Sequence, residues 1–326
     1  MLDRVERLCS SGLDAKALRE QVLAELRRVV PFDGHVWVLT DPVSRVGTAP
    51  LADVPGVSWD QLPRLVRSRY LSRGTRWTDL IEAGVSVRRA AGFEQFGVTD
   101  VLTAVCRDRF GCWAWLDLWR LTQPFTRAEQ DLVASLVPAL TAGLRQAQAR
   151  TFVAGPRVAP TGPAIVLLSP ELDVQLRTSA AREALHRLNP PDDPVVMLAI
   201  PAAAYNVAAA LIAEEQGMPV GPAWSRVHLA DGRWVTLRAA RAGEEIAVSI
   251  EDSTPAERLE VFGLAHALSP REREVLAELA TGADSRRLAE RLVLSEHTVN
   301  DHVKAVLAKT HAGTRAALLA RVAGTG

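Results

Sequence analysis

The chain has 326 residues, 38 basic and 38 acidic side chains, and no net formal charge at pH 7. This length predicts two or three domains, and a hydrophobic content of 48% is enough for well-packed cores. The balanced charge excludes a strongly basic surface along the whole chain.

Lysine usage excludes several enzyme classes. The lysines are Lys16, Lys304 and Lys309, so none lies between residues 17 and 303. A phosphate-binding loop of the Gly-x-x-x-x-Gly-Lys kind and a Schiff base with pyridoxal phosphate both need a lysine in that stretch. The sequence also lacks the motifs His-Glu-x-x-His, Gly-x-Ser-x-Gly and Gly-x-Gly-x-x-Gly. We therefore expect no enzyme activity and no cofactor.

The cysteines and the N-terminus bear on the compartment. Cys9, Cys106 and Cys112 have no metal-ligand spacing, and their odd number argues against a disulfide framework. The N-terminus is charged from Asp3 onward, which is not typical of a secretion signal. These features predict a cytoplasmic protein without a bound metal.

The first part of the chain predicts a mixture of helices and strands. The expected helices are residues 2–30, 59–72, 88–96 and 127–150. The expected strands are residues 35–39, 101–107 and 112–120. The two later strands form a hairpin, and the last helix is capped by Thr126 with Glu129 three residues on. This order resembles a GAF sensor domain, which the resemblance places at residues 1–150.

One strand of that region carries a candidate ligand pocket. Alternate residues of the strand at 112–120 share one face, and they are Trp113, Trp115, Asp117 and Trp119. A neighbouring strand adds Trp37. An aromatic wall with one carboxylate suits a flat or cationic small molecule. The alternative, which we favour, is that these rings pack outer helices onto the sheet.

A Gly/Pro-rich linker at residues 151–163 precedes a second mixed region. Its expected elements are strands at 164–168, 226–229, 234–240 and 246–250, and a helix at 179–188. The turn before Trp234 contains the hairpin signal Asp231-Gly232. This pattern resembles a PAS-type domain over residues 164–254. Such domains bind ligands or act as dimerising connectors.

The stretch from Val195 to Ala213 carries no charge and approaches the length of a membrane span. It consists mostly of alanine, with Pro201 and Asn206 near its middle. Alanine is much less apolar than leucine. We therefore expect a strand at 195–200 and a partly buried helix after it, and no membrane contact.

The C-terminal part predicts a compact set of helices after a linker helix at residues 255–267. Ser269, Pro270 and Glu272 form a helix start with a capping box. The helices expected in this part are residues 270–280, 285–292, 296–310 and 314–322. A short helix, a tight turn and a longer helix are typical of a helix-turn-helix, whose later helix enters the major groove of DNA.

The helix after Ser295 has two distinct faces. Its apolar positions are Val299, Val303, Val306 and Leu307, and its polar positions are His297, Asn300, Asp301 and Lys304. Asparagine can pair with adenine, lysine with guanine, and aspartate can accept from cytosine. The alternative is an ordinary solvated helix face.

Residues 268–326 resemble the DNA-binding domain of LuxR/FixJ-type transcription regulators. The matching motifs are Ser-x-Arg-Glu-x-Glu-Val-Leu from Ser269, Gly282 with Leu288-Ala289, and Ser-x-x-Thr-Val-x-x-His from Ser295. The resemblance assigns base contacts to Asn300, Asp301 and Lys304. It assigns contacts to the DNA backbone to Thr298, His302, Lys309 and Arg315. It also implies dimerisation through the last helix.

Two departures from the family pattern stand out. Asn300 replaces a common lysine, which predicts a different base preference, and Thr310-His311 replace a usual Leu-Gly. The commonest input of this class, a phospho-acceptor receiver domain, needs a lysine that the chain lacks. Regulators of this kind in actinobacteria often carry a GAF-like segment, which matches the order of elements here.

The sequence thus predicts a multidomain protein with two α+β sensor-like domains, GAF-like and PAS-like, followed by an all-α helix-turn-helix domain. The expected function is sequence-specific transcription regulation by a homodimer on double-stranded DNA, controlled by an unidentified small-molecule effector or partner. RNA polymerase is a further candidate partner. Two alternatives stay open: a sigma-factor-like promoter-recognition subunit, and a ligand-sensing GAF protein with a protein-binding helical tail.

Overall fold

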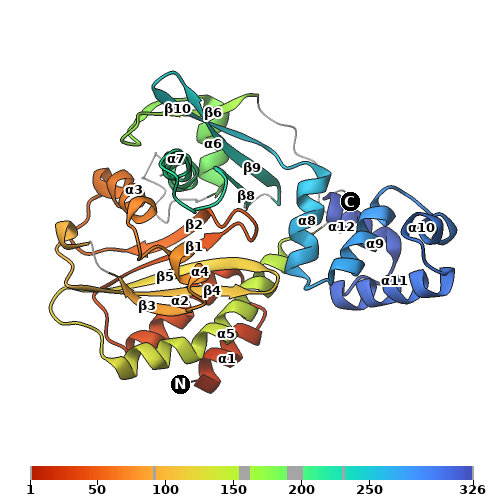
Figure 1. Ribbon diagram of the computed structural model, residues 1–326, viewed down its shortest axis with the longest axis horizontal. Coiled ribbons are helices and arrows are strands. Elements are labelled where there is room, and N and C mark those ends of the chain that lie inside the picture. Colours follow the sequence, from red (N-terminus) through yellow and green to blue (C-terminus); the bar gives the residue numbers. More distant parts are fainter. Residues whose placement is uncertain (1, 91–92, 154–161, 189–200, 230–231, 325–326) are drawn as a thin grey trace. The chain divides into compact units, whose positions relative to one another are not determined.

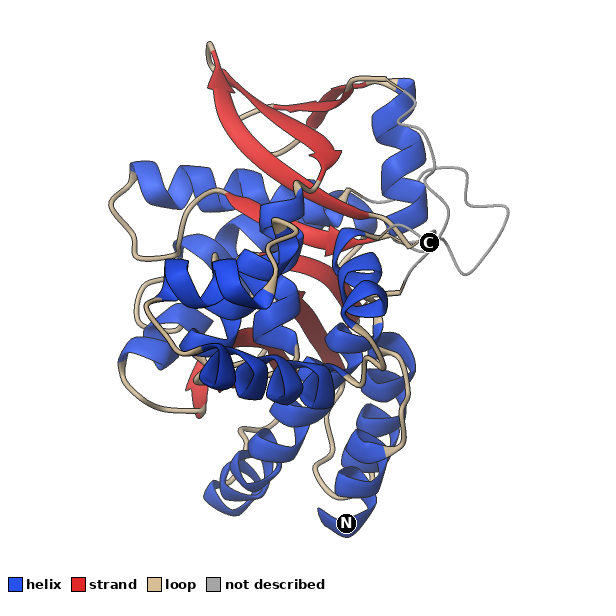
Figure 2. Cartoon of the chain, turned by 90° about the vertical axis from the view of Figure 1, so that its right-hand side faces the viewer, coloured by secondary structure: helices blue, strands red, loops and turns tan. Residues whose placement is uncertain are grey.

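The structure is a computed structural model that describes residues 2–90, 93–153, 162–188, 201–229 and 232–324. The chain divides into two compact units. Unit 1 comprises Met1–Ala147 and Pro160–Asp252, and unit 2 comprises Gln148–Ala159 and Ser253–Gly326. Unit 1 contains two antiparallel sheets with helices, and the described part of unit 2 consists of helices and connecting loops (Figure 2). Two α+β regions followed by a helical region are the predicted order of classes.

The first sheet has five strands in the order β2-β1-β5-β4-β3, and each neighbouring pair is antiparallel. Its strands are β1 (Gly34–Thr40), β2 (Gly47–Asp53), β3 (Val87–Ala90), β4 (Asp100–Asp108) and β5 (Gly111–Arg120). The predicted hairpin is confirmed as β4 and β5. The helices of this first region are α1 (Leu2–Ser10), α2 (Ala15–Arg27), α3 (Leu62–Leu71), α4 (Trp77–Glu82) and α5 (Arg127–Arg150). Helices α1, α2 and α5 cover one face of this sheet, and α3 lies on the other (Figure 1).

Three predictions for this region are wrong. The long first helix is interrupted by a turn at Gly12, whose φ of 82° favours glycine, and Asp14 caps α2 with bonds to two backbone amides. The segment predicted as a helix at 88–96 instead contributes the edge strand β3, followed by a short 3-10 turn at Glu94–Phe96. Strand β2 lies in a stretch, between residues 40 and 58, for which the sequence predicted neither a helix nor a strand. Both β2 and β3 are strands because each pairs with a neighbouring strand, β1 and β4 respectively.

The second sheet repeats the strand order of the first. Its order is β7-β6-β10-β9-β8, so both sheets follow the second, first, fifth, fourth and third strand of their own region. The strands are β6 (Ala164–Leu168), β7 (Val174–Arg177), β8 (Trp224–His228), β9 (Trp234–Ala242) and β10 (Glu245–Asp252). Helix α6 (Ser179–Leu188) matches its predicted bounds. The predicted strand at 195–200 and most of the predicted linker at 151–163 lie outside the described residues.

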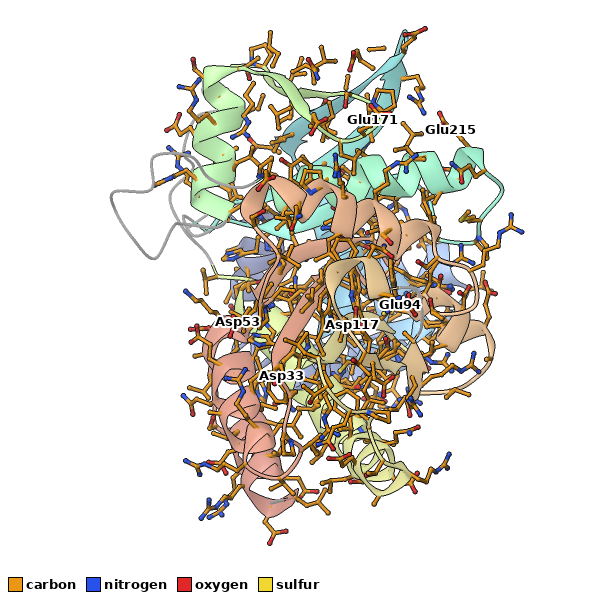
Figure 3. All side chains as sticks on the ribbon, turned by 90° about the vertical axis from the view of Figure 1, so that its left-hand side faces the viewer. Asp33, Asp53, Glu94, Asp117, Glu171 and Glu215 are labelled. Carbon is orange, nitrogen blue, oxygen red and sulfur yellow. The ribbon has the colours of Figure 1, made fainter. Side chains whose placement is uncertain are left out.

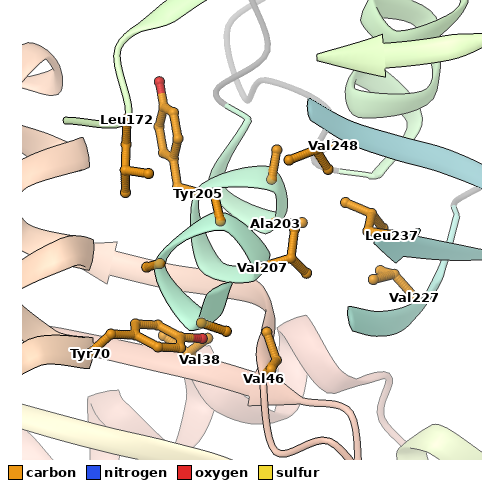
Figure 4. Packing of buried hydrophobic residues seen from close by; sticks show 14 of the residues in the cluster. Val38, Val46, Tyr70, Leu172, Ala203, Tyr205, Val207, Val227, Leu237 and Val248 are labelled. Carbon is orange, nitrogen blue, oxygen red and sulfur yellow. The ribbon is translucent and has the colours of Figure 1, made fainter. Parts of the chain in front are cut away.

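Helix α7 (Ala202–Glu215) lies between the two sheets of unit 1 and packs against both. On one side it meets Val38, Val46 and Tyr70 from the first sheet region, and on the other it meets Val227 and Leu237 (Figure 4). Its residues are buried around nearly the whole helix from Ala202 to Ala213, which explains why this stretch carries no charge. Within the described residues, no helix is long and apolar enough to cross a membrane.

Polar contacts also join the two sheet regions of unit 1. The hydroxyl of Tyr70 donates to Oδ1 of Asn206 in α7 over 3.0 Å, and it accepts from the backbone N–H of Gly47 over 3.0 Å. Asp41, beside β1, forms an ion pair with Arg226 in β8. The two sheets therefore share one core.

Five helices lie wholly within the described part of unit 2, and a side chain caps the start of each. The helices are α8 (Pro255–Ala265), α9 (Pro270–Ala280), α10 (Ser285–Leu292), α11 (Glu296–Thr310) and α12 (Arg315–Ala323). The N-caps are Thr254, Ser269, Asp284, Ser295 and Thr314, each accepting from a backbone N–H of the first turn. All the predicted helix starts in this unit are confirmed to within one residue.

Candidate nucleic-acid interface

Helix α11 is held by a small apolar core that leaves one of its faces outward. Buried side chains of three helices make this core: Val275, Leu279, Leu288, Ala289, Val299 and Val303. Helix α10 ends at Val293, which adopts a left-handed conformation with φ 54°, and Ser295 then caps α11. The sharp turn between α10 and α11 follows from this pair of caps, and it gives the helix-turn-helix order predicted from the sequence.

The outward face of α11 carries Asp301 between two exposed basic side chains. His297 Nε2 lies 3.5 Å from one carboxylate oxygen of Asp301, and Lys304 Nζ lies 3.6 Å from the other. The side chains of His297 and Lys304 are 86% and 78% exposed. Pairs this exposed contribute little to stability and exchange readily for another partner. Asp301 and Lys304 are thus accessible and charged.

Asn300 is placed differently from its neighbours on the helix. Its side chain is half-buried, and its Oδ1 accepts from Oγ of Ser285 over 3.0 Å and from Nη2 of Arg315 over 3.2 Å. Arg315 also donates to Ser285 over 2.9 Å. These three residues tie α10, α11 and α12 together. Asn300 therefore does not stand free beside Asp301 and Lys304.

The residues predicted to contact the DNA backbone are spread over both ends of α11 and the start of α12. Thr298, in the first turn, donates its backbone N–H to Ser295 Oγ over 3.1 Å. His302 is half-buried. Lys309 donates to both carboxylate oxygens of Glu272, over 2.8 and 2.7 Å. Arg315 and Lys309 thus each have a partner within unit 2.

The Glu272 carboxylate joins the start of α9 to the end of α11. It accepts from the backbone N–H of Ser269 as well as from Lys309. Burial of Glu272 raises the pKa of this carboxyl, but the bonds from Lys309 and Ser269 outweigh it and hold the pKa below its ordinary value. The ion pair is therefore in its charged form at neutral pH.

Helix α12 is held by two segments that connect to unit 1 along the chain. Arg258 of α8 donates to the carbonyl of Val322 over 2.8 Å, and Arg321 donates to the carbonyl of Phe152 over 3.0 Å. The ring of Phe152, which follows α5, meets that of Phe262 edge to face at 5.2 Å. We call Phe152, Arg258, Phe262, Arg321 and Val322 the α12 clamp.

The aromatic residues predicted to line a ligand pocket are all buried, with at most 3% exposure: Trp37, Trp113, Trp115, Asp117 and Trp119. Trp115 stacks on Trp77 at 4.0 Å, and Trp119 packs against Phe93. Trp37 pairs with Leu116 in the register of β1 and β5, so it lies on the opposite face of the sheet from Trp115.

Asp117 lies deep among the side chains of the first sheet region (Figure 3). Its two carboxylate oxygens accept from Arg69 over 2.9 and 3.0 Å, and one also accepts from Thr103 over 2.6 Å. Sequence reasoning missed Arg69 as its partner, since the two residues lie 48 positions apart. The described side chains thus already cover this wall and engage its carboxylate. A ligand at these residues stays a prediction.

Comparison with known families identifies the C-terminal region. Residues 266–322 match the family model described as bacterial regulatory proteins, luxR family. The match spans α9, α10, α11 and most of α12. This part of the chain is a LuxR-family helix-turn-helix domain, as its motifs predicted, and such domains bind DNA.

Other comparisons add little. No curated protein matches the chain. The structure of SdiA in complex with octanoyl-rac-glycerol aligns over 100% of this chain and 93% of its own, with 13% identity and a TM-score of 0.35. The crystal structure of Escherichia coli SdiA in the space group P6522 aligns over 96% of this chain and 92% of its own, with 15% identity and a TM-score of 0.32. The E. coli DhaR(N)–DhaL complex aligns over 77% and 88%, with 12% identity and a TM-score of 0.27. These TM-scores are too low to support an argument about this chain.

Proposed function

We propose that the chain is a sequence-specific transcription regulator that binds DNA as a homodimer and is controlled through unit 1. The observation that carries this proposal is the outward face of α11 within a segment that matches the luxR family. Its charged side chains are accessible, and the core that positions them faces the other way. The major groove of DNA admits a helix with such a face.

Within this proposal, Lys304 and Asp301 read base edges. Lys304 reaches the acceptors of a guanine, and Asp301 accepts from a cytosine amino group or orients Lys304. Asn300 contributes to base reading after exchanging its bond to Arg315 for one to an adenine. Because that exchange costs an internal hydrogen bond, the preference at its base pair is weaker than that set by Lys304.

Thr298, His302, Lys309 and Arg315 serve as contacts to the DNA backbone. Contacts of this kind fix the register of the helix and carry no sequence information by themselves. The partners of Lys309 and Arg315 hold these cations at fixed places on unit 2, which suits a positioning role. Because contacts between these cations and phosphates release counterions, DNA binding weakens with added salt.

Dimerisation is assigned to α12. Ala316 and Ala317 are exposed on this helix, whereas Leu318 and Val322 are buried. Small exposed residues allow close approach of a second copy of the helix. A symmetric dimer reads an inverted repeat whose half-sites lie about one or more helical turns apart.

Unit 1 controls dimerisation through the residues of the α12 clamp. The two segments that hold α12 are the residues after α5 and helix α8, and each continues directly into unit 1 along the chain. A signal that moves either segment changes the support of the dimerising helix. The two sheets of unit 1 are proposed as a GAF-like and a PAS-like sensor domain, which their shared strand order supports.

The sigma-like alternative finds no support in the second region of unit 1. A sigma-like subunit needs helices upstream of its helix-turn-helix to bind the polymerase core. That stretch instead contains the five-stranded antiparallel sheet of β6 to β10, with helices α6 and α7. The other alternative is a GAF protein whose helical tail binds a protein. A measurement of DNA binding distinguishes it from the proposed regulator, because only the regulator binds DNA.

The test is selection of bound sites from random duplex DNA with the full chain. We expect enrichment of one inverted repeat, and a shifted consensus at one base pair per half-site for Lys304→Gln. Lys16→Gln, a substitution of the same kind in α2 of unit 1, serves as the control and should give the wild-type consensus. Recovery of no enriched sequence by the wild-type chain would refute the proposal.

A further inference from the structure

An open pocket of about 530 Å³ lies in unit 1 between helix α3 and the turn that joins β6 to β7. Arg64, Arg67 and Leu71 line it from α3 at helical spacing, together with serines of the same face. Glu171 and Asp173 line it from the turn. Glu171 lies beyond α3, on the side of the second sheet (Figure 3). The volume falls within the range of small-molecule sites.

The charged side chains that line this pocket are not engaged in ion pairs. Within the described residues, no ion pair is formed by Arg64, Arg67, Glu171 or Asp173. The Nε of Arg67 is buried and has no hydrogen-bond partner among them. By contrast, Arg69 on the same helix makes four hydrogen bonds to Asp117, Thr103 and the carbonyl of Thr75. This nitrogen, like several other buried donors among the described residues, can form a further hydrogen bond.

The turn that carries the two carboxylates has a fixed backbone. The hydroxyl of Ser169 accepts from the backbone N–H of Glu171 and of Asp173, each over 3.2 Å. Leu172, between them, is fully buried and adopts a left-handed φ of 71°. Figure 4 shows its side chain beside Tyr205 of α7. The backbone that carries the two carboxylates is therefore held in place before any ligand binds, which reduces the entropy lost on binding.

We infer that this pocket binds a small zwitterion of the amino-acid or dipeptide kind. Its carboxylate pairs with Arg67 and Arg64, and its ammonium pairs with Glu171 and Asp173. A guanidinium binds a carboxylate through two parallel hydrogen bonds, which gives the ligand a defined orientation. Leu71 offers apolar contact to the part between the two charges. A ligand held this way connects α3 of the first region to the β6–β7 turn of the second.

This inference names an effector class for the regulator, and in that sense it rests on the proposed function. Binding to the pocket can nevertheless be measured without DNA. A chain that binds a zwitterion but recognises no DNA sequence would count against the proposed function alone. A chain that recognises a DNA sequence but binds no zwitterion would count against this inference alone.

The test measures binding to the full chain by ligand-observed NMR and calorimetry. The probes are the standard α-amino acids and a set of dipeptides, each compared with its N-acetyl and its C-amide derivative. We expect at least one free zwitterion to bind, and both derivatives, which lack one charge each, to bind at least tenfold more weakly. Preference for amino acids over dipeptides, or the opposite, identifies the source of the ligand.

Two variants and a control make the assignment specific. Arg67→Gln and Asp173→Asn should each weaken binding of that probe by tenfold or more. Arg73→Gln, an exposed arginine just beyond α3 that does not line the pocket, should leave the affinity unchanged. Binding of no zwitterion, equal binding of the N-acetyl derivative, or wild-type affinity in both variants would overturn the inference.

Discussion

Asp41 and Arg226 lie 185 residues apart in the sequence and form a buried ion pair in unit 1. Arg226 donates from Nε to Oδ2 of Asp41 over 2.7 Å and from Nη2 to Oδ1 over 3.1 Å. Their side chains are 1% and 0% exposed. Asp41 also accepts from the backbone N–H groups of Val43 and Ser44. This pair therefore joins the two sheet regions at a place from which water is excluded.

Asp41→Ala should lower the free energy of unfolding of unit 1 by about 3–5 kcal/mol, because it leaves a buried guanidinium without its carboxylate. Urea unfolding followed by tryptophan fluorescence measures this. Glu215→Ala, which removes the carboxylate of the much more exposed pair with Arg241, is the matched control and should cost less than about 1 kcal/mol. Equal effects of the two substitutions would contradict the structural role of Asp41.

Gly47→Ala should also destabilise unit 1. A Cβ at this position would lie 2.4 Å from Oδ1 of Asn206 and 2.7 Å from Cη2 of Trp115, so α7 and the first sheet would have to separate. Overpacking of this kind costs about 1–3 kcal/mol. Gly313→Ala, where a Cβ meets nothing within 4 Å, should leave stability nearly unchanged. A shift of the unfolding midpoint for Gly313→Ala alone would contradict the packing described for α7.

Glu272 predicts a pH dependence of unit 2. Its folded pKa lies below the ordinary value of 4.5, so the unfolded chain binds a proton first as the pH falls. The stability that this carboxylate contributes is present above pH 4.5 and is lost as the pH falls through the folded pKa. The protection factors of the amides in α9 and α11, which correct for the intrinsic exchange rate at each pH, should thus fall more steeply from roughly pH 5 to roughly pH 3 in the wild type than in Glu272→Gln.

The control for this prediction is Glu274→Gln. Glu274 pairs with Arg271, and its side chain is 53% exposed. This variant should keep the steep pH dependence of the wild type. If Glu272→Gln kept it as well, Glu272 would not be its source.

Val293 should be replaceable with a gain in stability. It is a β-branched residue in a left-handed conformation, and it is 89% exposed, so its side chain gains little from packing. Val293→Asn should raise the free energy of unfolding of unit 2 by about 1 kcal/mol, because asparagine tolerates this conformation. Thermal unfolding measures the change. Val293→Ile, which keeps the β-branch, should show no gain, and a gain of equal size in this variant would contradict the explanation by backbone strain.

The sequence predicted unit 2 well because its signals are local. Each helix starts at a Ser, Thr or Asp that caps its own first turn, and Ser269 and Glu272 complete a capping box within four residues. The bounds of α10 follow from Asp284 and the turn at Val293. The inward placement of Asn300 was not predictable, because its partner Arg315 comes from the next helix and the direction of its side chain depends on that contact.

In unit 1 the errors come from contacts between distant residues. Val87–Ala90 has a composition that suits a helix surface, and only its pairing with β4 makes it a strand. The alternation of Trp115, Asp117 and Trp119 follows the period of a strand, as predicted, whereas the register of β4 and β5 shifts at Trp113. The partners Arg69 and Trp77, which cover Asp117 and Trp115, come from another part of the chain and have no local signal. This cover agrees with the favoured interpretation that the rings pack helices onto the sheet. The shared core around α7 has no signal beyond an uncharged, alanine-rich stretch.

The most direct measurement for the central claim is the affinity of Lys304→Ala for the selected operator, set against that of Lys16→Ala. Fluorescence anisotropy with the wild-type operator and a set of single base-pair variants gives both affinity and specificity. Lys304→Ala should lose about 1–3 kcal/mol of binding free energy and no longer discriminate at one base pair, while Lys16→Ala should match the wild type. Unchanged affinity and unchanged discrimination for Lys304→Ala would contradict the assignment of α11 as the helix that reads DNA.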